Sequence, residues 1–304
     1  MIDYLDMSEE IKKKKTVSFS QFSNWWTCPF KWYRDYILHE KVFEDSVHMS
    51  FGTAIHEAIQ SYLKTLYDSG NEEAEKVDMV SHFTNSFKRE LEKKKIPHTQ
   101  DDFNSFIEDG TNILSEFKDP SNRYLHFSRD KWELLGIEEE INEDILNNVN
   151  LTAKLDIVLR EKMSGDIRIV DFKTSGNGWT NSNKEDFTKI SQLLLYKAVY
   201  SKKYNLPLSK IHVEFFILKR RLYDAKTTRY KQSRIQVFKP SSYQKDVSEV
   251  IQEFGKFVKT CFTSDGEHNT TIKYPKNPGK GKKNCKYCNY LKNGKCDGIA
   301  EVLE

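Results

Sequence analysis

The sequence predicts an α/β fold with a mixed central sheet, and the order of its periodic segments carries this prediction. Helical periodicity dominates about the first 120 residues, where apolar side chains recur every three or four positions. The next segments are short, rich in β-branched and aromatic residues, and separated by turns that carry Asn, Asp and Gly. A helix, two strands and a last helix follow, an order that fits a mixed sheet better than a doubly wound one.

The first helix is predicted over residues 18–38, a segment dense in aromatic side chains. It begins at Ser18 or Ser20, a residue type that caps helices by accepting a backbone hydrogen bond. The Cys28-Pro29 pair predicts a kink, because proline cannot donate to the preceding turn. A cysteine beside a kink is well placed to point away from its helix. Most of the aromatic side chains are expected to form core rather than to stack on bases.

Three more helices complete the helical part. Residues 51–67 carry apolar side chains at helical spacing, which places His56 in the first turns of their helix. Two amphipathic segments, 72–95 and 101–118, form a helical insertion at about 70–120.

The β part is predicted as a three-stranded meander followed by a mixture of helices and strands. The meander strands are 132–141, 151–160 and 167–173; the later elements are a helix at 185–204, strands at 211–219 and 234–238, and a helix at 243–262.

Composition indicates a single globular domain spanning residues 1–304, with 38% hydrophobic and 31% charged residues. No apolar run long enough to cross a membrane, about 18 residues, is present, so an intracellular, cytoplasmic location in a bacterial, archaeal or phage-infected cell is expected. The net charge of +3 does not by itself indicate nucleic-acid binding. The segment 273–295, however, holds eight lysines and no acidic residue, which makes it a local positive patch or a solvated loop.

Two aspartates and a lysine form the candidate catalytic centre. Alternation along strand 167–173 puts Asp171 and Lys173 on one face, and a hairpin with the preceding strand brings Asp156 towards Asp171. Paired carboxylates favour a divalent cation, and their hard oxygen ligands suit Mg²⁺ or Mn²⁺. Gln192 and Tyr196 lie four residues apart on the next helix and share one face.

Four of the five cysteines form a second candidate site. Cys28 lies far upstream, whereas Cys285, Cys288 and Cys296 cluster near the C-terminus, and Cys261 lies on the apolar side of the last helix. A Cys-x-x-Cys pair with a third cysteine close behind indicates a metal site rather than a disulfide framework. Four thiolates suit structural zinc or an iron–sulfur cluster, and the spacing does not decide between them.

The motifs resemble those of RecB/AddB-type nucleases of the PD-(D/E)XK superfamily, in the same order along the chain. They are Gly52-Thr53-Ala54-Ile55-His56, Leu155-Asp156-Ile157, Val170-Asp171-Phe172-Lys173-Thr174 and Gln192 to Tyr196. The resemblance implies a restriction-endonuclease-like core in which His56, Asp156, Asp171 and the Phe172 carbonyl bind metal. Lys173 would be the catalytic lysine, and Gln192 and Tyr196 would hold the substrate or that lysine.

The cysteine arrangement is similar to that of iron–sulfur members such as AddB and the CRISPR-associated exonucleases. It implies a [4Fe–4S] cluster on Cys28, Cys285, Cys288 and Cys296, joining the tail at about 273–304 to the N-terminal segment. The gap between the last two cysteines is long for that pattern, which keeps zinc as the alternative. Lysines 280, 282 and 283 would then bind DNA.

The sequence therefore predicts a Mg²⁺- or Mn²⁺-dependent exonuclease that hydrolyses single-stranded DNA or DNA ends in repair, recombination or replication. The alternatives are an endonuclease or RNA-directed nuclease, a catalytically silent DNA-binding subunit, and a zinc-stabilised nucleic-acid-binding module. No Gly-x-x-x-x-Gly-Lys-Ser/Thr motif is present, so any unwinding is expected from a helicase or recombination partner.

Overall fold

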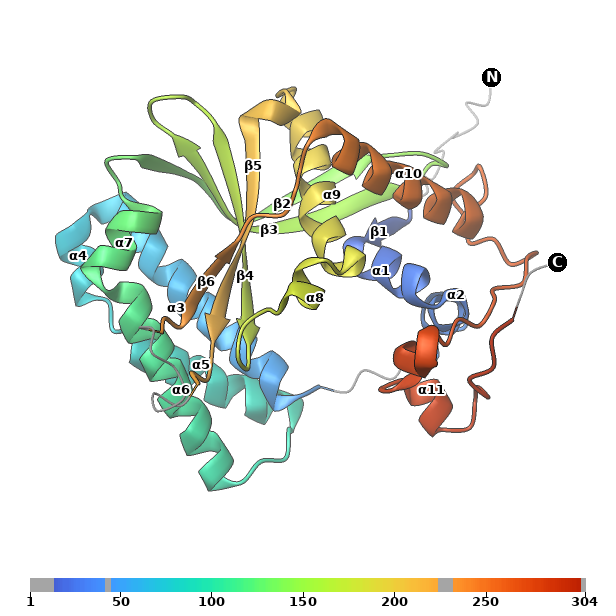
Figure 1. Ribbon diagram of the computed structural model, residues 1–304, viewed down its shortest axis with the longest axis horizontal. Coiled ribbons are helices and arrows are strands. Elements are labelled where there is room, and N and C mark those ends of the chain that lie inside the picture. The colour runs from blue at the N-terminus through green and yellow to red at the C-terminus, as the bar shows by residue number, and fades with distance from the viewer. Residues whose placement is uncertain (1–13, 42–44, 224–231, 302–304) are drawn as a thin grey trace, which may run out of the picture. The chain divides into compact units, whose positions relative to one another are not determined.

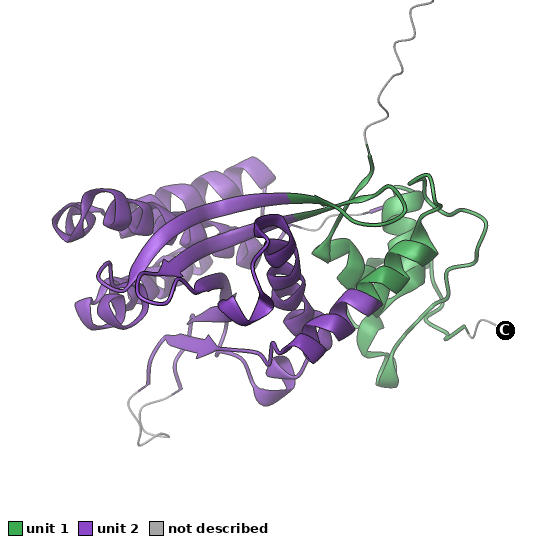
Figure 2. Cartoon of the chain, turned by 90° about the horizontal axis from the view of Figure 1, so that it is seen from above, with its two compact units in different colours: residues 1–39, 142–152, 253–304 green, residues 40–141, 153–252 purple. Residues whose placement is uncertain are grey.

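The computed structural model describes residues 14–41, 45–223 and 232–301, so the outermost residues of the predicted 1–304 domain lie outside these ranges. The chain divides into two compact units, which are coloured separately in Figure 2. Unit 1 combines residues 1–39, 142–152 and 253–304, and unit 2 combines residues 40–141 and 153–252. Each unit therefore draws on segments that are distant in sequence.

The strands form a mixed sheet, as predicted (Figure 1). Strand β3 pairs antiparallel with β4, β4 pairs parallel with β5, β5 pairs antiparallel with β6, and β2 pairs with β3. A short strand, β1, pairs parallel with the first residues of β3 inside unit 1. The bounds are β1 Thr16–Ser18, β2 Trp132–Asp144, β3 Asn150–Glu161, β4 Ile167–Ser175, β5 Ile211–Lys219 and β6 Ile235–Phe238.

Helices cover both faces of the unit 2 sheet. One face packs on a helical layer through a core that includes Phe172 of β4 and Phe216 of β5. The opposite face, to which the alternate residues of β4 point, contacts helix α9. The helical layer consists of α3 Val47–Ser69, α4 Asn71–Lys76, α5 Met79–Lys94, α6 Gln100–Lys118 and α7 Pro120–Phe127; α8 Asn181–Lys184, α9 Phe187–Tyr204 and the short η2 Leu208–Lys210 follow β4.

Two helix boundaries differ from prediction for reasons of capping. Helix α3 begins earlier than expected, because the Ser46 side chain accepts a hydrogen bond from the Met49 N–H, so His56 lies in the third turn. The single helix predicted over 72–95 is two helices, because Asp78 accepts the Ser81 N–H at 2.9 Å and starts α5 anew.

Unit 1 is built around an aromatic core. Trp32 is fully buried and contacts the rings of Phe257, Phe262 and Tyr274, so core packing accounts for this part of the aromatic N-terminal segment. The predicted kink is present, since Cys28 is extended and Pro29 opens the next helix. The helices are α1 Phe19–Thr27, α2 Pro29–Trp32, the π-helical η1 Tyr33–Ile37, η3 Lys280–Cys285 and α11 Asn289–Lys292; α10 Gln244–Cys261 contributes its second half.

None of the helices described combines the length and apolar character that crossing a bilayer requires.

Candidate active site and cysteine pocket

The β3–β4 hairpin brings the two predicted aspartates together in unit 2. The register pairs Ile157 with Val170, which sets Asp156 and Asp171 opposite each other one step further along. The Oδ2 atom of Asp156 accepts the Phe172 N–H at 2.7 Å. Lys173 Nζ lies 2.7 Å from Asp171 Oδ2, so the aspartate and lysine share one face of β4 as alternation predicts.

Burial makes both carboxylates costly to ionise. Loss of solvent raises the pKa of Asp156 and that of Asp171 to about 6, although the nearby Lys173 ammonium lowers both. The Asp171 side chain is only 5% exposed, and its Oδ2 atom accepts no hydrogen bond of good geometry despite the ion pair with Lys173. The pair therefore holds more negative charge than its surroundings compensate.

His56 reaches this pair from α3. Its Nδ1 atom lies 3.8 Å from Asp156 Oδ2, and its ring packs 5.8 Å from that of Phe172. Burial lowers the pKa of His56 to about 4, so the imidazole is neutral at pH 7 and keeps a lone pair for a ligand. Helix α3 can approach β4 because position 52 is glycine: a Cβ there would stand 3.2 Å from Thr174 Oγ1.

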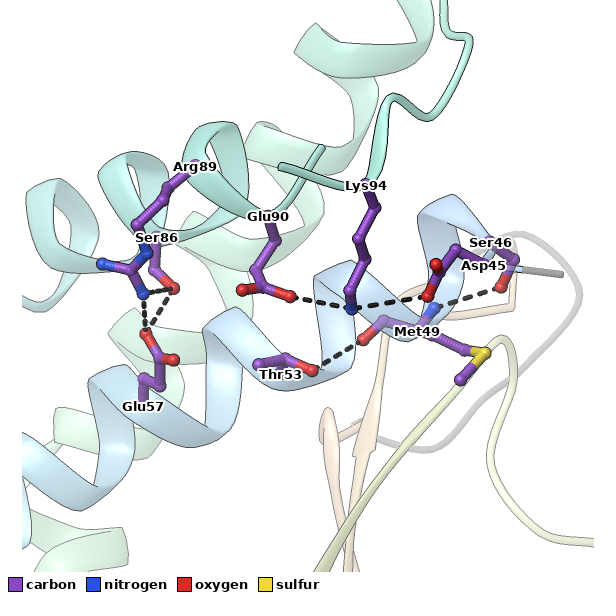
Figure 3. Close-up of polar contacts among 9 residues, drawn as sticks. All are labelled: Asp45, Ser46, Met49, Thr53, Glu57, Ser86, Arg89, Glu90 and Lys94. Atoms are coloured by element: carbon purple, nitrogen blue, oxygen red, sulfur yellow. Dashed lines mark hydrogen bonds and ion pairs between the residues drawn. The ribbon is translucent and has the colours of Figure 1, made fainter. Parts of the chain in front are cut away.

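Polar contacts with α5 hold α3 in this position (Figure 3). Glu57, the residue after His56, accepts hydrogen bonds from Ser86 and Arg89. Nearer the beginning of α3, Lys94 Nζ lies 2.8 Å from an oxygen of Glu90 in the same helix, α5. It also lies 3.7 Å from an oxygen of Asp45, just before α3. Polar contacts thus join α5 to α3 and to the residue before its N-cap.

Gln192 and Tyr196 interact on α9 as their spacing predicts. Gln192 Nε2 donates to Tyr196 Oη at 3.0 Å. Tyr196 is 8% exposed, and burial followed by the Asp171 charge raises the pKa of its phenol. The phenol thus stays protonated and faces the carboxylates as a hydrogen-bond donor.

Glu138 is a site residue that the sequence reasoning missed. Its charge raises the pKa values of His56, Asp156 and Tyr196, and its carboxylate contacts Gln60 and Lys154. Glu138 has a φ of 53° within β2, a left-handed conformation that is uncommon for a residue other than glycine. Strand alternation alone does not single out one member of this run of three glutamates.

Among the residues that the structure describes, no group of three or more His, Cys, Asp or Glu side chains is arranged to hold a metal ion. Lys173 contacts one oxygen of Asp171, and the Phe172 N–H donates to one oxygen of Asp156.

The four predicted cysteines line one pocket of unit 1, with a volume of about 20 Å³. Burial, followed by the proximity of the other three, raises the pKa of Cys285. Backbone N–H groups of Asn277 and Gly298 donate to the sulfurs of Cys28 and Cys296, each at 3.4 Å. Cys261 lies apart in the apolar core, where burial raises the pKa of its thiol.

The basic tail is partly neutralised within unit 1. Lys276 contacts Asp297 and Glu301, and Lys273 contacts Glu301. The three lysines predicted to bind DNA, Lys280, Lys282 and Lys283, are exposed.

Comparison with known proteins agrees with this geometry. Residues 16–292 match the family model described as the PD-(D/E)XK nuclease superfamily. A search of curated proteins found no significant match to the chain. The match spans nearly all of the chain and includes the β3–β4 hairpin with its aspartates and lysine. The chain therefore belongs to the PD-(D/E)XK nuclease superfamily.

Proposed function

We propose that this protein is a metal-dependent deoxyribonuclease that degrades single-stranded DNA or DNA ends as an exonuclease. The observation that carries the proposal is the pair of carboxylates, buried Asp171 and part-buried Asp156, whose pKa values rise to about 6 beside Lys173. Such perturbed groups cluster at functional sites. Retention of both aspartates with the lysine favours a nuclease over a catalytically silent DNA-binding subunit, which needs none of them.

Nucleases of this superfamily generally use divalent metal ions. His56, Asp156, Asp171 and the Phe172 carbonyl would hold one here. The donor set fits, because it joins two carboxylates to a neutral imidazole. Once bound, Mg²⁺ or Mn²⁺ would activate water and offset charge on the phosphate.

The protein's own groups position the phosphodiester. Lys173 is one-third exposed, so its ammonium can donate to a non-bridging phosphate oxygen and stabilise the charge that develops during attack by water. The protonated Tyr196 phenol, oriented by Gln192, can donate to the same phosphate or to its neighbour. Lys280, Lys282 and Lys283 are proposed to bind the DNA backbone.

We further propose that Cys28, Cys285, Cys288 and Cys296 bind a [4Fe–4S] cluster, with structural zinc as the alternative. Four sulfurs around one pocket, two of them accepting backbone N–H bonds, support either occupant. A brown protein that contains iron and acid-labile sulfide supports the cluster; a colourless protein that contains zinc excludes it.

The test is degradation of end-labelled single- and double-stranded DNA in the presence of Mg²⁺ or Mn²⁺. An exonuclease leaves closed circular DNA intact and gives a product ladder from one labelled end, which reports polarity. Cutting of circles indicates an endonuclease, and preference for labelled RNA indicates an RNA-directed enzyme. If folded, metal-loaded protein binds DNA but cuts none of these substrates, the binding-subunit interpretation replaces the nuclease.

A further inference from the structure

A second cavity lies in unit 2, away from the carboxylate pair. Its volume is about 930 Å³, and it is lined by α9, the η2 region, the start of β5 and the segment that leads from β6 into α10. His212, on its wall, is the second residue of β5, whereas Lys173 pairs with Ile217 near the other end of that strand. The cavity and the candidate active site are thus at opposite ends of β5.

A buried lysine without a carboxylate partner lines this cavity. Lys197 is only 4% exposed, and its Nζ donates to the carbonyl and hydroxyl oxygens of Ser242, at 2.7 and 3.2 Å. No carboxylate of the described residues lies within ion-pair distance of Nζ; the nearby Asp246 is engaged by Ser241 and the Tyr243 N–H. An ammonium has three hydrogens, so one remains for a ligand. A buried cation of this kind favours an anion.

The cavity rim supplies two further basic side chains, and each of them shares its acidic partner with another basic residue. Lys239 is highly exposed and lies 3.7 Å from Glu214, whose other oxygen is bonded to Arg168. His212 lies 3.1 Å from Asp166, which also binds Lys210. A flexible lysine can therefore turn towards a ligand while the carboxylate that it leaves remains paired.

The remaining lining suits the rest of a nucleotide. Pro207, Leu208 and Pro240 give apolar walls, and serine hydroxyls add donors beside the lysines. Tyr243 is 80% exposed, so its ring is open to stacking. We propose that this cavity binds the phosphate of a nucleotide through Lys197 and Lys239, with the nucleoside against the apolar wall. The phosphate can belong to a free mononucleotide or to a DNA strand that passes over the cavity.

The test is calorimetric titration of the full-length protein with inorganic phosphate, deoxyadenosine monophosphate and a short single-stranded oligonucleotide. The titrations contain no Mg²⁺ or Mn²⁺, so that metal-dependent cleavage cannot occur, and a failure of the nuclease proposal would leave their result unchanged. Binding of the mononucleotide assigns a free nucleotide as the ligand. Binding of the oligonucleotide alone assigns a strand phosphate.

Two variants locate that binding. Lys197→Met and Lys239→Glu should each weaken binding of the nucleotide or oligonucleotide roughly tenfold or more, because each removes a charge-assisted hydrogen bond to the phosphate. Lys203→Met, which removes a part-exposed lysine paired with Glu139, is the control and leaves the affinity unchanged. Since Lys239 is exposed, its variant remains informative even if Lys197→Met is unstable. Binding that neither variant weakens, or no binding of any probe, overturns the proposal.

Discussion

Removal of one buried charge from the candidate active site should stabilise the metal-free protein at neutral pH. The pKa of Asp171 is raised from 3.8 to about 6 by burial. Each pKa unit is worth about 1.4 kcal/mol, so ionised Asp171 costs the folded state up to about 3 kcal/mol relative to the unfolded chain. The Asp171→Asn variant should therefore unfold at higher urea concentration than the wild type at pH 7.5 in EDTA.

The sign of the pH dependence follows from the raised pKa. The folded state holds its proton more tightly, so stability is fully present below pH 4, where Asp171 is protonated in both states, and is lost as the pH rises through about 6. His56 acts in the opposite direction, because its lowered pKa costs stability as the pH falls below 6.5. The difference in the free energy of unfolding between wild type and Asp171→Asn isolates the effect of Asp171. This difference should shrink to near zero at pH 4.

Urea unfolding at both pH values, followed by fluorescence, measures this difference. Addition of Mg²⁺ should stabilise the wild type at pH 7.5 and have little effect on Asp171→Asn. Asp68→Asn, an exposed carboxylate paired with Lys64 on α3, should show neither effect and serves as the control. An Asp171→Asn variant that is less stable than the wild type in EDTA at pH 7.5 would refute the reasoning.

Two further predictions concern how the site is positioned. Tyr196→Phe removes the hydroxyl that faces the carboxylates and should lower the cleavage rate roughly tenfold. The unfolding midpoint should change little, because the ring and its packing remain. An unchanged cleavage rate would show that Tyr196 is not part of the site. Gly52→Ala places a Cβ 3.2 Å from Thr174 Oγ1, so the Thr174 side chain or α3 must give by a few tenths of an ångström, and both cleavage and divalent-metal affinity should fall. Gly255→Ala meets no atom within 4 Å on its helix and should instead stabilise by up to about 1 kcal/mol; equal behaviour of the two variants would contradict the close approach.

Short-range patterns predicted the hairpin that forms the site. Alternation placed Asp171 and Lys173 on one face, and the turn between the strands fixed which residues face each other. The spacing of four placed Gln192 beside Tyr196. These relations depend only on backbone period, so a single sequence reveals them. The importance of His56, in contrast, came from resemblance alone.

Features that depend on tertiary contacts were not predictable in this way. Glu138 lies at the site through its contacts with Gln60 of α3 and Lys154 of β3. The burial of Lys197 depends on Ser242, which is distant in sequence. Residue types and local spacing carry no signal of such contacts.

The central claim is that Lys173 acts in phosphodiester hydrolysis beside the Asp156–Asp171 pair. Its most direct test is single-turnover cleavage of end-labelled DNA by Lys173→Ala, with Lys203→Ala as a matched control, since both lysines are about one-third exposed and each pairs with a carboxylate. DNA affinity measured in Ca²⁺ shows whether substrate still binds. The account predicts that Lys173→Ala binds DNA but cleaves at least a hundredfold more slowly, roughly the effect of losing one positioned electrostatic group, while Lys203→Ala cleaves normally. Equal cleavage by the two variants would contradict it.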